Sequence, residues 1–409
     1  AGGGAMPLDI LIAGAGIGGL AAAAALAQSG HRVRVFDQFD APAPVGSGLV
    51  IQPVGLDVLD RLGAAQAALA HGNRIHRMMG REAASGRRVL DVSYDGPGDP
   101  RFGLAIHRTA LFQALFDAAE AAGAQIVPGH RVTAHAQGRL DFAHGAAASG
   151  DLIVDALGAS SCLSPLQAQP LGYGALWATV DWVPEAGLPE NELRQVYRRA
   201  SRMLGVLPVG RLPGDAARKA AVFWSLPADG HAAWQARGLA AWRDEAVTLW
   251  PALAPFAGQI TAPDQMTMAR YSHGTLRRPY GDGIVHVGDA AHRASPQLGQ
   301  GANMALLDAW ALARALQQAQ DDTALALQWY AMARRWHVRG YQWMSRLFTP
   351  QYQSDSTVLP LLRDRVLFPL SQVPPLPRVL TRLVCGDLLP PFGSLPEERA
   401  AIHDRDGAL

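Results

Sequence analysis

The feature that most constrains this chain is a dense group of glycines between a short apolar run and an alanine-rich segment near its start. Residues 8–13 form the apolar run, which predicts a buried parallel strand ending at glycine. Residues 17–29 are rich in alanine and predict a helix, and residues 32–36 alternate β-branched side chains and predict the next strand. This order predicts one βαβ unit with a right-handed crossover, and therefore a parallel sheet.

The glycines have the spacing of a turn that binds a dinucleotide, at Gly14, Gly16 and Gly19. The first permits the tight turn, the second lets backbone amides approach a pyrophosphate, and the third allows the helix to pack closely on the strand. The helix beginning at Ile17 offers unpaired amides and the positive end of its dipole to phosphates. Asp37 ends the next strand at a spacing where an acid accepts hydrogen bonds from ribose hydroxyls. The pattern predicts FAD or NAD binding; the alternative is a glycine-rich turn beside a surface aspartate.

Length and composition bound the remaining possibilities. A chain of 409 residues usually forms two domains or one domain with a large insertion, and 49% hydrophobic residues suffice for a sizeable core. The net charge of +1 gives no electrostatic footprint for nucleic acid, and we interpret the arginine-rich residues 194–202 as a solvated helix face. The apolar residues 10–27 are interrupted by glycines, so we expect no membrane span.

The cysteine content indicates the compartment. Cys162 and Cys385 are too few for a disulfide scaffold and have no metal-ligand spacing, so we expect no metal and a reducing cytoplasm. We leave residues 1–5 out of the fold and expect the native chain to start at Met6, with no signal peptide after it.

A second glycine-bearing segment lies in the last third of the chain. A buried strand ends at Gly288, which places Asp289 at its carboxyl edge, within reach of the hydroxyls of a ribityl chain. Gly299 and Gly301 allow a loop to lie flat against a planar ring. The helix that begins near Ala302 points its amides at that ring, and its dipole would stabilise negative charge on a reduced flavin.

Four stretches together resemble the FAD-dependent aromatic hydroxylases, the class A flavoprotein monooxygenases with a p-hydroxybenzoate hydroxylase-like fold. They are residues 12–37, 46–53, 106–111 and 288–303, and the similarity spans residues 7–347. The resemblance implies that FAD is the cofactor. It also implies contacts from the following positions: Gly14, Gly16, Ile17, Gly19, Asp37, Gly48, Arg108, Val132, Gly288, Asp289, Pro296, Gly299, Gln300, Gly301 and Asn303.

Two of these positions carry a more specific expectation. Arg108 would contact the ribityl and phosphate part of the cofactor with its fork of donors, the alternative being a surface arginine at a helix start. Val132 would offer its backbone to the adenine. Pro296 and His292 would flank the flavin ring, and no catalytic side chain is assigned, because a hydrogen-bonded structural histidine is the simpler interpretation of His292.

The resemblance implies an α/β fold with three parts. These are a discontinuous Rossmann-like FAD-binding domain, an inserted antiparallel β-sheet domain that binds substrate, and a C-terminal helical segment. In the same order, they comprise residues 6–72, 100–172 and 270–347; residues 73–99 and 173–269; and residues 348–409.

The chemistry implied is a monooxygenation. NADH or NADPH would reduce the flavin transiently, O2 would add to it as a hydroperoxide, and one oxygen atom would pass to a small aromatic or apolar substrate. Such a site must exclude water, so the inserted domain would act as a lid. Trp177, Phe223 and Trp224 would wall the substrate pocket, the alternative being that they form ordinary sheet core. The sequence indicates neither the substrate's identity nor the oligomeric state.

The sequence departs from the family in a motif of the form Asp-Gly-x-x-Ser-x-x-Arg, linked to FAD and nicotinamide binding. Gly158 and Ser161 match, but Leu157 replaces the aspartate and Ser164 replaces the arginine. Leucine cannot accept a hydrogen bond, and serine cannot make a bidentate phosphate contact. Electrons would therefore come from NADH or NADPH through other contacts, or from a separate reductase. A flavoprotein oxidase or dehydrogenase of the same fold and a non-catalytic FAD-binding protein are the alternative functions.

Overall fold

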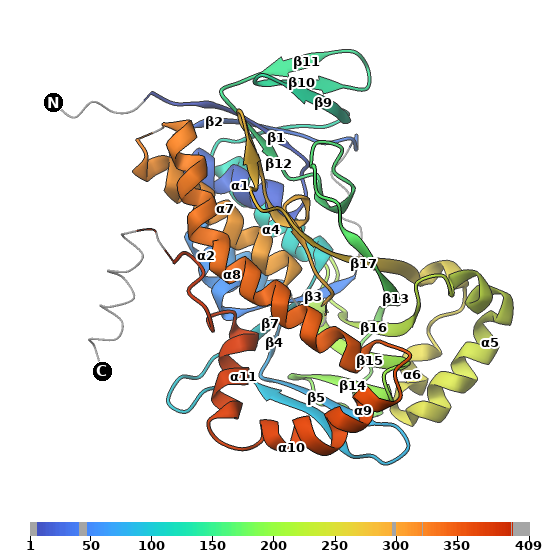
Figure 1. The fold of residues 1–409 in the computed structure, drawn as a ribbon. Coiled ribbons are helices and arrows are strands. Elements are labelled where there is room, and N and C mark those ends of the chain that lie inside the picture. The colour runs from blue at the N-terminus through green and yellow to red at the C-terminus, as the bar shows by residue number, and fades with distance from the viewer. Residues whose placement is uncertain (1–5, 41–46, 297–299, 321, 394, 396–409) are drawn as a thin grey trace.

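The computed structural model describes residues 6–40, 47–296, 300–320, 322–393 and 395. Its parts are a parallel sheet with helices, a larger and mostly antiparallel sheet, and a C-terminal group of helices below both (Figure 1). The fold is α/β, as predicted. Among the described residues, no helix combines the length and the apolar character needed to cross a membrane.

The six-stranded sheet contains the predicted βαβ unit. Its neighbouring strands are parallel except at β18, which is antiparallel to β19. From one edge to the other they are β18 (Tyr280–Gly281), β19 (Ile284–His286), β12 (Leu152–Asp155), β1 (Asp9–Ala13), β2 (Arg32–Phe36) and β8 (Gln125–Val127). The central strands β1 and β12 are almost wholly buried, which is why they are continuous apolar runs.

Four helices pack on or beside this sheet: α1 (Ile17–Gln28), α4 (Arg108–Ala121), α7 (Gly301–Gln318) and α8 (Thr323–Tyr352). Helix α1 buries residues Gly19–Leu26 without a gap, because small alanines let α4 and α7 approach it closely. The sequence predicted both ends of α1 and the start of α7 to within one residue.

Two small three-stranded sheets flank the parallel sheet. One contains β3 (Gly48–Ile51), β7 (Gly103–His107) and β4 (Asn73–Ile75). Helices α2 (Pro53–Arg61) and α3 (Ala65–His71) connect β3 to β4. The other contains β9 (Val132–Ala136), β10 (Arg139–Phe142) and β11 (Ala147–Ser149).

The eight-stranded sheet forms the second large layer, and it is antiparallel except for the parallel pairing of β14 with β5. In order, its strands are β20 (His292–Arg293), β17 (Thr267–Thr275), β13 (Gln169–Asp181), β16 (Arg218–Pro227), β15 (Arg202–Arg211), β14 (Glu192–Arg198), β5 (Arg77–Glu82) and β6 (Arg88–Ser93). The interpretation of residues 194–202 as a helix face was wrong. They form β14 and the turn into β15, because Val196 alternates with polar neighbours and packs into the sheet core.

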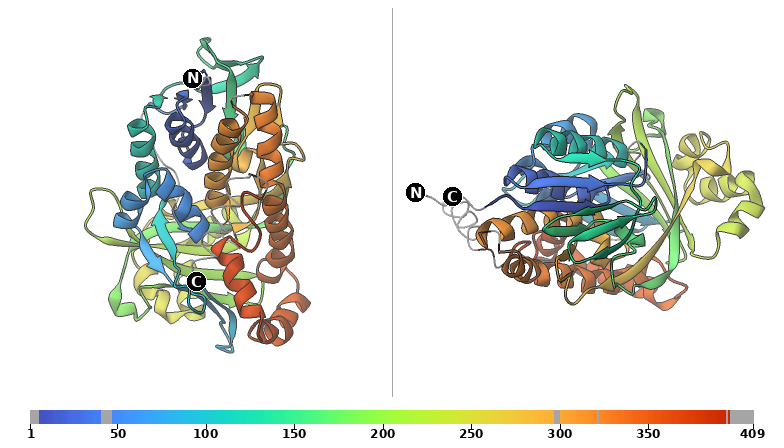
Figure 2. Two further views of the ribbon diagram at one scale, coloured as in Figure 1. Left: turned by 90° about the vertical axis from the view of Figure 1, so that its left-hand side faces the viewer. Right: turned by 90° about the horizontal axis from the view of Figure 1, so that it is seen from above.

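The two faces of this sheet have different partners. Helices α5 (His231–Leu249) and α6 (Ala254–Ala257) cover the outer face, where Trp224 meets Trp242 edge to face at 6.0 Å. Seen from above, the eight-stranded sheet lies between the parallel sheet and α5 (Figure 2). The inner face carries Trp177 and Phe223 and faces the parallel-sheet region and the C-terminal helices.

The C-terminal segment is built from the end of α8 and from α9 (Val358–Leu362), a π-helical turn (Arg363–Leu367), α10 (Phe368–Ser371) and α11 (Leu376–Cys385). Its last three elements contact β6, and Figure 1 shows them beneath the eight-stranded sheet. Three elements cross domain boundaries predicted from the sequence. β13 crosses the boundary between residues 172 and 173, β17 the one between 269 and 270, and α8 the one between 347 and 348. Neighbouring parts of the molecule therefore share single strands and a single helix.

Candidate active site

The first glycine turn is fixed by contacts that leave no room for a side chain. Gly14 has φ +99°, and a Cβ atom there would lie 2.5 Å from the carbonyl oxygen of Ala156. At Gly19 an added Cβ would lie 1.8 Å from the carbonyl oxygen of Gly14. At Gly16 it would meet no described atom within 4 Å, so the backbone there is open to a ligand. No side chain in the described part of the chain caps α1 at Gly16, so its first amides remain available.

Asp37 holds this turn against the end of β2. Its carboxylate accepts hydrogen bonds from the amides of Ala15 at 2.8 Å and Phe39 at 3.1 Å, and the Gly14 amide donates to the Phe36 carbonyl at 2.8 Å. A carboxylate has about four acceptor positions, so Asp37 retains capacity for ribose hydroxyls. Ile17 opens α1 beside it. The turn thus has the shape and the donors for a pyrophosphate, and its role remains a prediction.

Arg108 and Asp289 both line one cavity between the parallel-sheet region and the eight-stranded sheet, and their charges interact. Arg108 is the first residue of α4, whose cap is the side chain of His107, which accepts from the Thr109 amide at 3.1 Å. Burial lowers the pKa of Arg108, and the negative charge of Asp289 opposes this. Burial raises the pKa of Asp289, opposed by nearby cations that include His292 and Arg108. Both side chains line the cavity, where a donor fork and an acceptor suit an oxygen-rich ligand.

A buried charged cluster holds the second glycine loop, and the sequence analysis did not find it. Asp308 of α7 accepts from the Gly288 amide at 2.9 Å, from His292 Nε2 at 2.6 Å and from Arg334 Nε at 2.7 Å. Burial raises the pKa of Asp308, but His292 and Arg334 together lower it to about 2. The sequence did contain one indication of this cluster: Asp308 is an acid among apolar residues of a predicted helix, and a buried charge requires a partner.

The other predicted residues of this loop lie in three situations. Pro296, Gln300 and Gly301 line the cavity, whereas Gly299 lies outside the described residues. Asn303 is fully buried; its side chain accepts from the Gln52 amide at 2.8 Å and donates to the Val50 carbonyl at 3.1 Å, which ties α7 to β3. The resemblance implied only a cofactor contact for Asn303, which remains a prediction, and these hydrogen bonds show a structural role.

His292 and Val132 have contacts that bear on their expected roles. His292 is buried, lines the cavity, and uses Nε2 in its bond to Asp308. No catalytic role is assigned to it, since that nitrogen is occupied. Val132 is not among the residues that line the cavity; it packs with Phe36 in an apolar cluster on the side of the first turn. Gly48, in β3, lines the cavity, and a Cβ there would lie 2.3 Å from Val209 Cγ1.

The positions that depart from the family motif have structural contacts. Ser164 Oγ donates to the Ala290 carbonyl at 2.5 Å, and Leu157 packs in the apolar cluster with Val132. Ser161 Oγ donates to Asp155, a fully buried acid that also bonds Nδ1 of His286 at 2.7 Å. An acid two positions before Leu157 therefore anchors this loop, and Ser164 links the loop to the Gly288–Ala290 turn.

One continuous cavity of about 1300 Å³ is lined by Gly48, Arg108 and Asp289 together with residues of the inner face of the eight-stranded sheet. The first glycine turn and Asp37 are not part of its lining. Trp177 and Phe223 line it, and Trp177 Nε1 donates to the Tyr271 hydroxyl at 3.0 Å. The expectation for Trp224 was wrong. Successive side chains of a strand point to opposite faces, so Trp224 packs under α5 while Phe223 faces the cavity.

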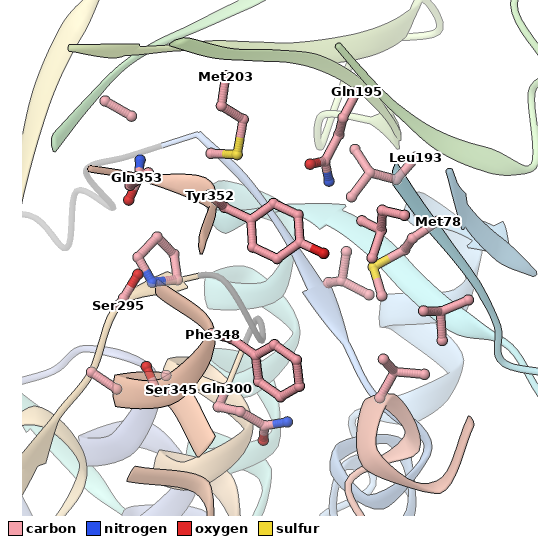
Figure 3. Close-up of a pocket in the computed structure, with 18 of the residues that line it drawn as sticks. Met78, Leu193, Gln195, Met203, Ser295, Gln300, Ser345, Phe348, Tyr352 and Gln353 are labelled. Atoms are coloured by element: carbon pink, nitrogen blue, oxygen red, sulfur yellow. The ribbon is translucent and has the colours of Figure 1, made fainter. Parts of the chain in front are cut away.

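The C-terminal segment supplies much of the remaining wall, which the sequence did not indicate. Figure 3 shows Phe348 and Tyr352 pointing from α8 into the space below Met203 and Gln195 of the sheet. Gln353, which follows the last residue of α8, lies beside Tyr352 (Figure 3), and Leu380 of α11 also lines the cavity. Most of these side chains are apolar, and a periodic apolar pattern by itself does not distinguish a cavity wall from core.

Comparison with known proteins gives results in three respects. The model of the family described as FAD binding domain matches residues 7–339. The chain is 28% identical over 324 residues to the 2-heptyl-3-hydroxy-4(1H)-quinolone synthase of Mycobacteroides abscessus, covering 76% of this chain and 82% of that protein. It is 29% identical over 356 residues to the FAD-dependent urate hydroxylase of Klebsiella pneumoniae, covering 81% of this chain and 87% of that protein. The crystal structure of 2-methyl-3-hydroxypyridine-5-carboxylic acid oxygenase, mutant C294A, superposes with a TM-score of 0.77 at 22% identity, covering 95% of this chain and all of that one.

Proposed function

The chain belongs to the FAD binding domain family, and from this premise we propose that it is an FAD-dependent monooxygenase acting on a small aromatic or apolar substrate. One observation carries the proposal: a single cavity connects several of the predicted flavin contacts, among them Arg108, Asp289 and Gln300, to a largely apolar chamber. The curated relatives named above include a hydroxylase and a synthase of hydroxylated rings, which supports the same chemistry. The overall reaction balances as substrate, O2, NAD(P)H and a proton giving hydroxylated substrate, NAD(P)+ and water.

The residues present fit FAD. The open backbone at Gly16 and the uncapped start of α1 suit the pyrophosphate, and Asp37 suits the adenosine ribose. Arg108 and Asp289 suit the ribityl part, and both amide atoms of buried Gln300 have no partner among the described residues, as expected for a side chain that contacts a ligand. When bound, FAD supplies the redox chemistry that passes electrons from a reductant to O2.

The protein's own contribution is orientation and exclusion of water. The buried contacts of Asp308 fix the Gly288 loop, and the start of α7 directs its amides toward the same part of the cavity. Trp177, Phe223 and Tyr352 form apolar walls, which shield reactive species from hydrolysis. We assign cofactor binding to residues 6–72, 100–172 and 270–347, and enclosure of substrate to the inserted sheet and the C-terminal segment. We further propose that the protein acts in the cytoplasm.

NADH or NADPH is the proposed reductant. Leu157 and Ser164 lack the charges of the family motif, but the packing of Leu157 and the Ser164 bond to Ala290 show how this loop is held without them. A dinucleotide would then be oriented by other groups that line the cavity, and Arg108 is one cationic candidate for contact with its phosphates. A separate reductase is the alternative source of electrons.

The test is a spectrum of purified protein followed by rapid-mixing reduction with NADH and with NADPH. We expect flavin absorbance, reduction that accelerates with aromatic substrates, and incorporation of one atom of 18O from labelled O2. Stoichiometric hydrogen peroxide without incorporation would instead establish an oxidase. A protein that binds FAD but is reduced by neither dinucleotide, with or without a reductase, would be a non-catalytic FAD-binding protein. A folded protein that takes up no FAD would overturn the proposal.

A further inference from the structure

We propose that the substrate is an uncharged aromatic ring with an aliphatic chain. Its polar group is bound by Ser295 and Gln353, and its chain is enclosed by the C-terminal segment. This inference rests on the proposed function, since it names the substrate class of the same cavity.

The polar end of the cavity is defined by side chains whose hydrogen-bonding atoms have no partner. Ser295, Gln342 and Gln353 are 2%, 8% and 5% exposed, and all three line the cavity. Among the described residues, no partner reaches Ser295 Oγ, Gln342 Oε1, or either amide atom of Gln353. Buried polar atoms of this kind are normally satisfied, so Ser295 and Gln353, which lie on the same side of the pocket (Figure 3), indicate a ligand with donors and acceptors. Gln342, in α8, lies about three helical turns before Gln353 and contacts a different part of the cavity.

The charges around the cavity argue that this ligand is neutral. Asp91 is paired with Arg77 and Arg88, and Arg363 donates to Asp364 at 2.6 Å and to two backbone carbonyls. Arg346 also lines the cavity, but it is exposed, so water solvates its charge. Arg108 and Asp289 lie at the predicted cofactor end. An ionised group placed beside Gln353 would therefore lose its hydration without a dedicated counter-charge.

The opposite end of the cavity is apolar. The strands β5, β6 and β14 provide Met78, Val89 and Leu193, and the C-terminal segment provides Leu367, Phe368 and Leu380. Figure 3 shows Met78 and Leu193 on the strand side, with Tyr352 between them and Gln353. Leu362 and Leu370 line the cavity and are 42% and 51% exposed, so they mark where it reaches the surface.

The cavity extends well beyond the predicted flavin contacts. Ligand pockets usually enclose about 300–1000 Å³, and this cavity is larger because it combines the flavin end with the apolar end under the C-terminal segment. A single ring beside the flavin would leave the leucines and Phe368 of the C-terminal segment without contact. A chain attached to the ring passes Tyr352 and reaches them, and each buried methylene gains from leaving water.

The experiment is calorimetric titration of the FAD-loaded protein with phenol and with 4-alkylphenols from methyl to heptyl. We expect the dissociation constant to fall about two- to fourfold for each added methylene. A chain of the same length ending in a carboxylate should bind at least tenfold more weakly than 4-heptylphenol. An affinity that does not change with chain length, or equal binding of the carboxylate, would overturn the inference.

Two variants locate the chain. Leu367→Trp fills the apolar end, and we expect it to reduce the ratio of heptylphenol to phenol affinity at least tenfold. Leu361→Trp is the matched control, because Leu361 is 55% exposed on the same segment and does not line the cavity. If both variants leave the ratio unchanged, the chain does not occupy this end and the inference fails.

One variant locates the polar group. Gln353→Leu keeps the size of the side chain and removes its amide, so it should weaken every member of the series by about the same factor of five to ten. An unchanged affinity would exclude Gln353 as a contact. Binding is measured without turnover. A chain-length effect in a protein that incorporates no 18O from labelled O2, with NAD(P)H alone or with a reductase added, would therefore disprove monooxygenation and leave the binding inference standing.

Discussion

The two glycine-bearing loops of the site are stabilised in different ways. The Gly14–Gly19 turn is shaped by close backbone contacts and by the hydrogen bonds of Asp37. The Gly288 loop is held by Asp308 and Arg334, which come from two helices, together with the loop's own His292. The first loop depends on the absence of side chains within one βαβ unit, and the second depends on buried charges brought together by tertiary packing. This difference predicts distinct responses to mutation and to pH.

The largest effect is expected from Asp308→Ala. It leaves Arg334 and His292 buried without their anion, so the free energy of unfolding should fall by about 3–5 kcal/mol. Urea unfolding of the FAD-free protein at neutral pH measures this change. A loss below about 1 kcal/mol would mean that the charged cluster is incidental to the second loop.

For the first loop, Gly19→Ala and Gly16→Ala form a matched pair. Gly19→Ala places a methyl group against the Gly14 carbonyl and should cost about 1–3 kcal/mol of stability. Gly16→Ala meets no described atom, so stability should change by less than about 0.5 kcal/mol, while the FAD dissociation constant rises at least tenfold. Fluorescence titration and urea unfolding separate the two, and equal FAD affinity of Gly16→Ala and wild type would refute the role of this backbone.

The pH dependence of stability should come from the charged cluster that holds the Gly288 loop. His337 accepts from Arg334 Nη1 and donates from Nε2 to the Gly386 carbonyl at 2.8 Å, linking the cluster to the end of α11. Burial, followed by the charge of Arg334, lowers the pKa of His337 from 6.5 to about 3. The unfolded chain therefore takes up this proton first, and stability present above pH 6.5 is lost as the pH falls toward 3.

Between pH 7.5 and 5.5 this histidine should cost about 1.4 kcal/mol of stability. Urea unfolding at both pH values measures the change, and His337→Gln, which keeps neutral hydrogen-bonding groups, should show a smaller one. The pKa values of His107 and His273 are also lowered by burial, so the variant should retain part of the pH effect. Identical pH profiles for variant and wild type would contradict the assignment.

The smallest effect is expected from a charge near the first loop. Asp9 begins β1 and pairs with Arg32 Nε at 2.7 Å, but both side chains are exposed. Asp9→Ala should therefore change the free energy of unfolding far less than Asp308→Ala does, since water screens the pair. A cost comparable with that of Asp308→Ala would show that charge stabilises both loops alike.

Local patterns predicted the parts of the fold that depend on nearest neighbours. The first βαβ unit and the start of α7 were placed to within a residue or two, because their periodicity and glycines report directly on backbone geometry. β14 was mistaken for a helix face, since arginines obscured its alternation. Trp224 was placed on the wrong face because a difference of one residue in register reverses the direction of a side chain.

The site shows the same division. Gly14, Gly16 and Asp37 could be assigned from spacing alone, whereas Asp308 and Arg334 lie on separate helices and have no shared motif. Tyr352, Gln353 and Leu380 could not be identified as cavity residues, because a packed core and a cavity wall use the same apolar side chains. Only the unpartnered amides and the continuous cavity distinguish them.

The sequence by itself determined the family, the parallel sheet and the turn suited to the cofactor phosphates, since each depends on steric rules that act over a few residues. The tertiary structure decided how the second loop is held, which face of the large sheet meets the cavity, and that the C-terminal segment encloses it. These features depend on contacts between residues far apart in the chain, and such contacts leave no local pattern.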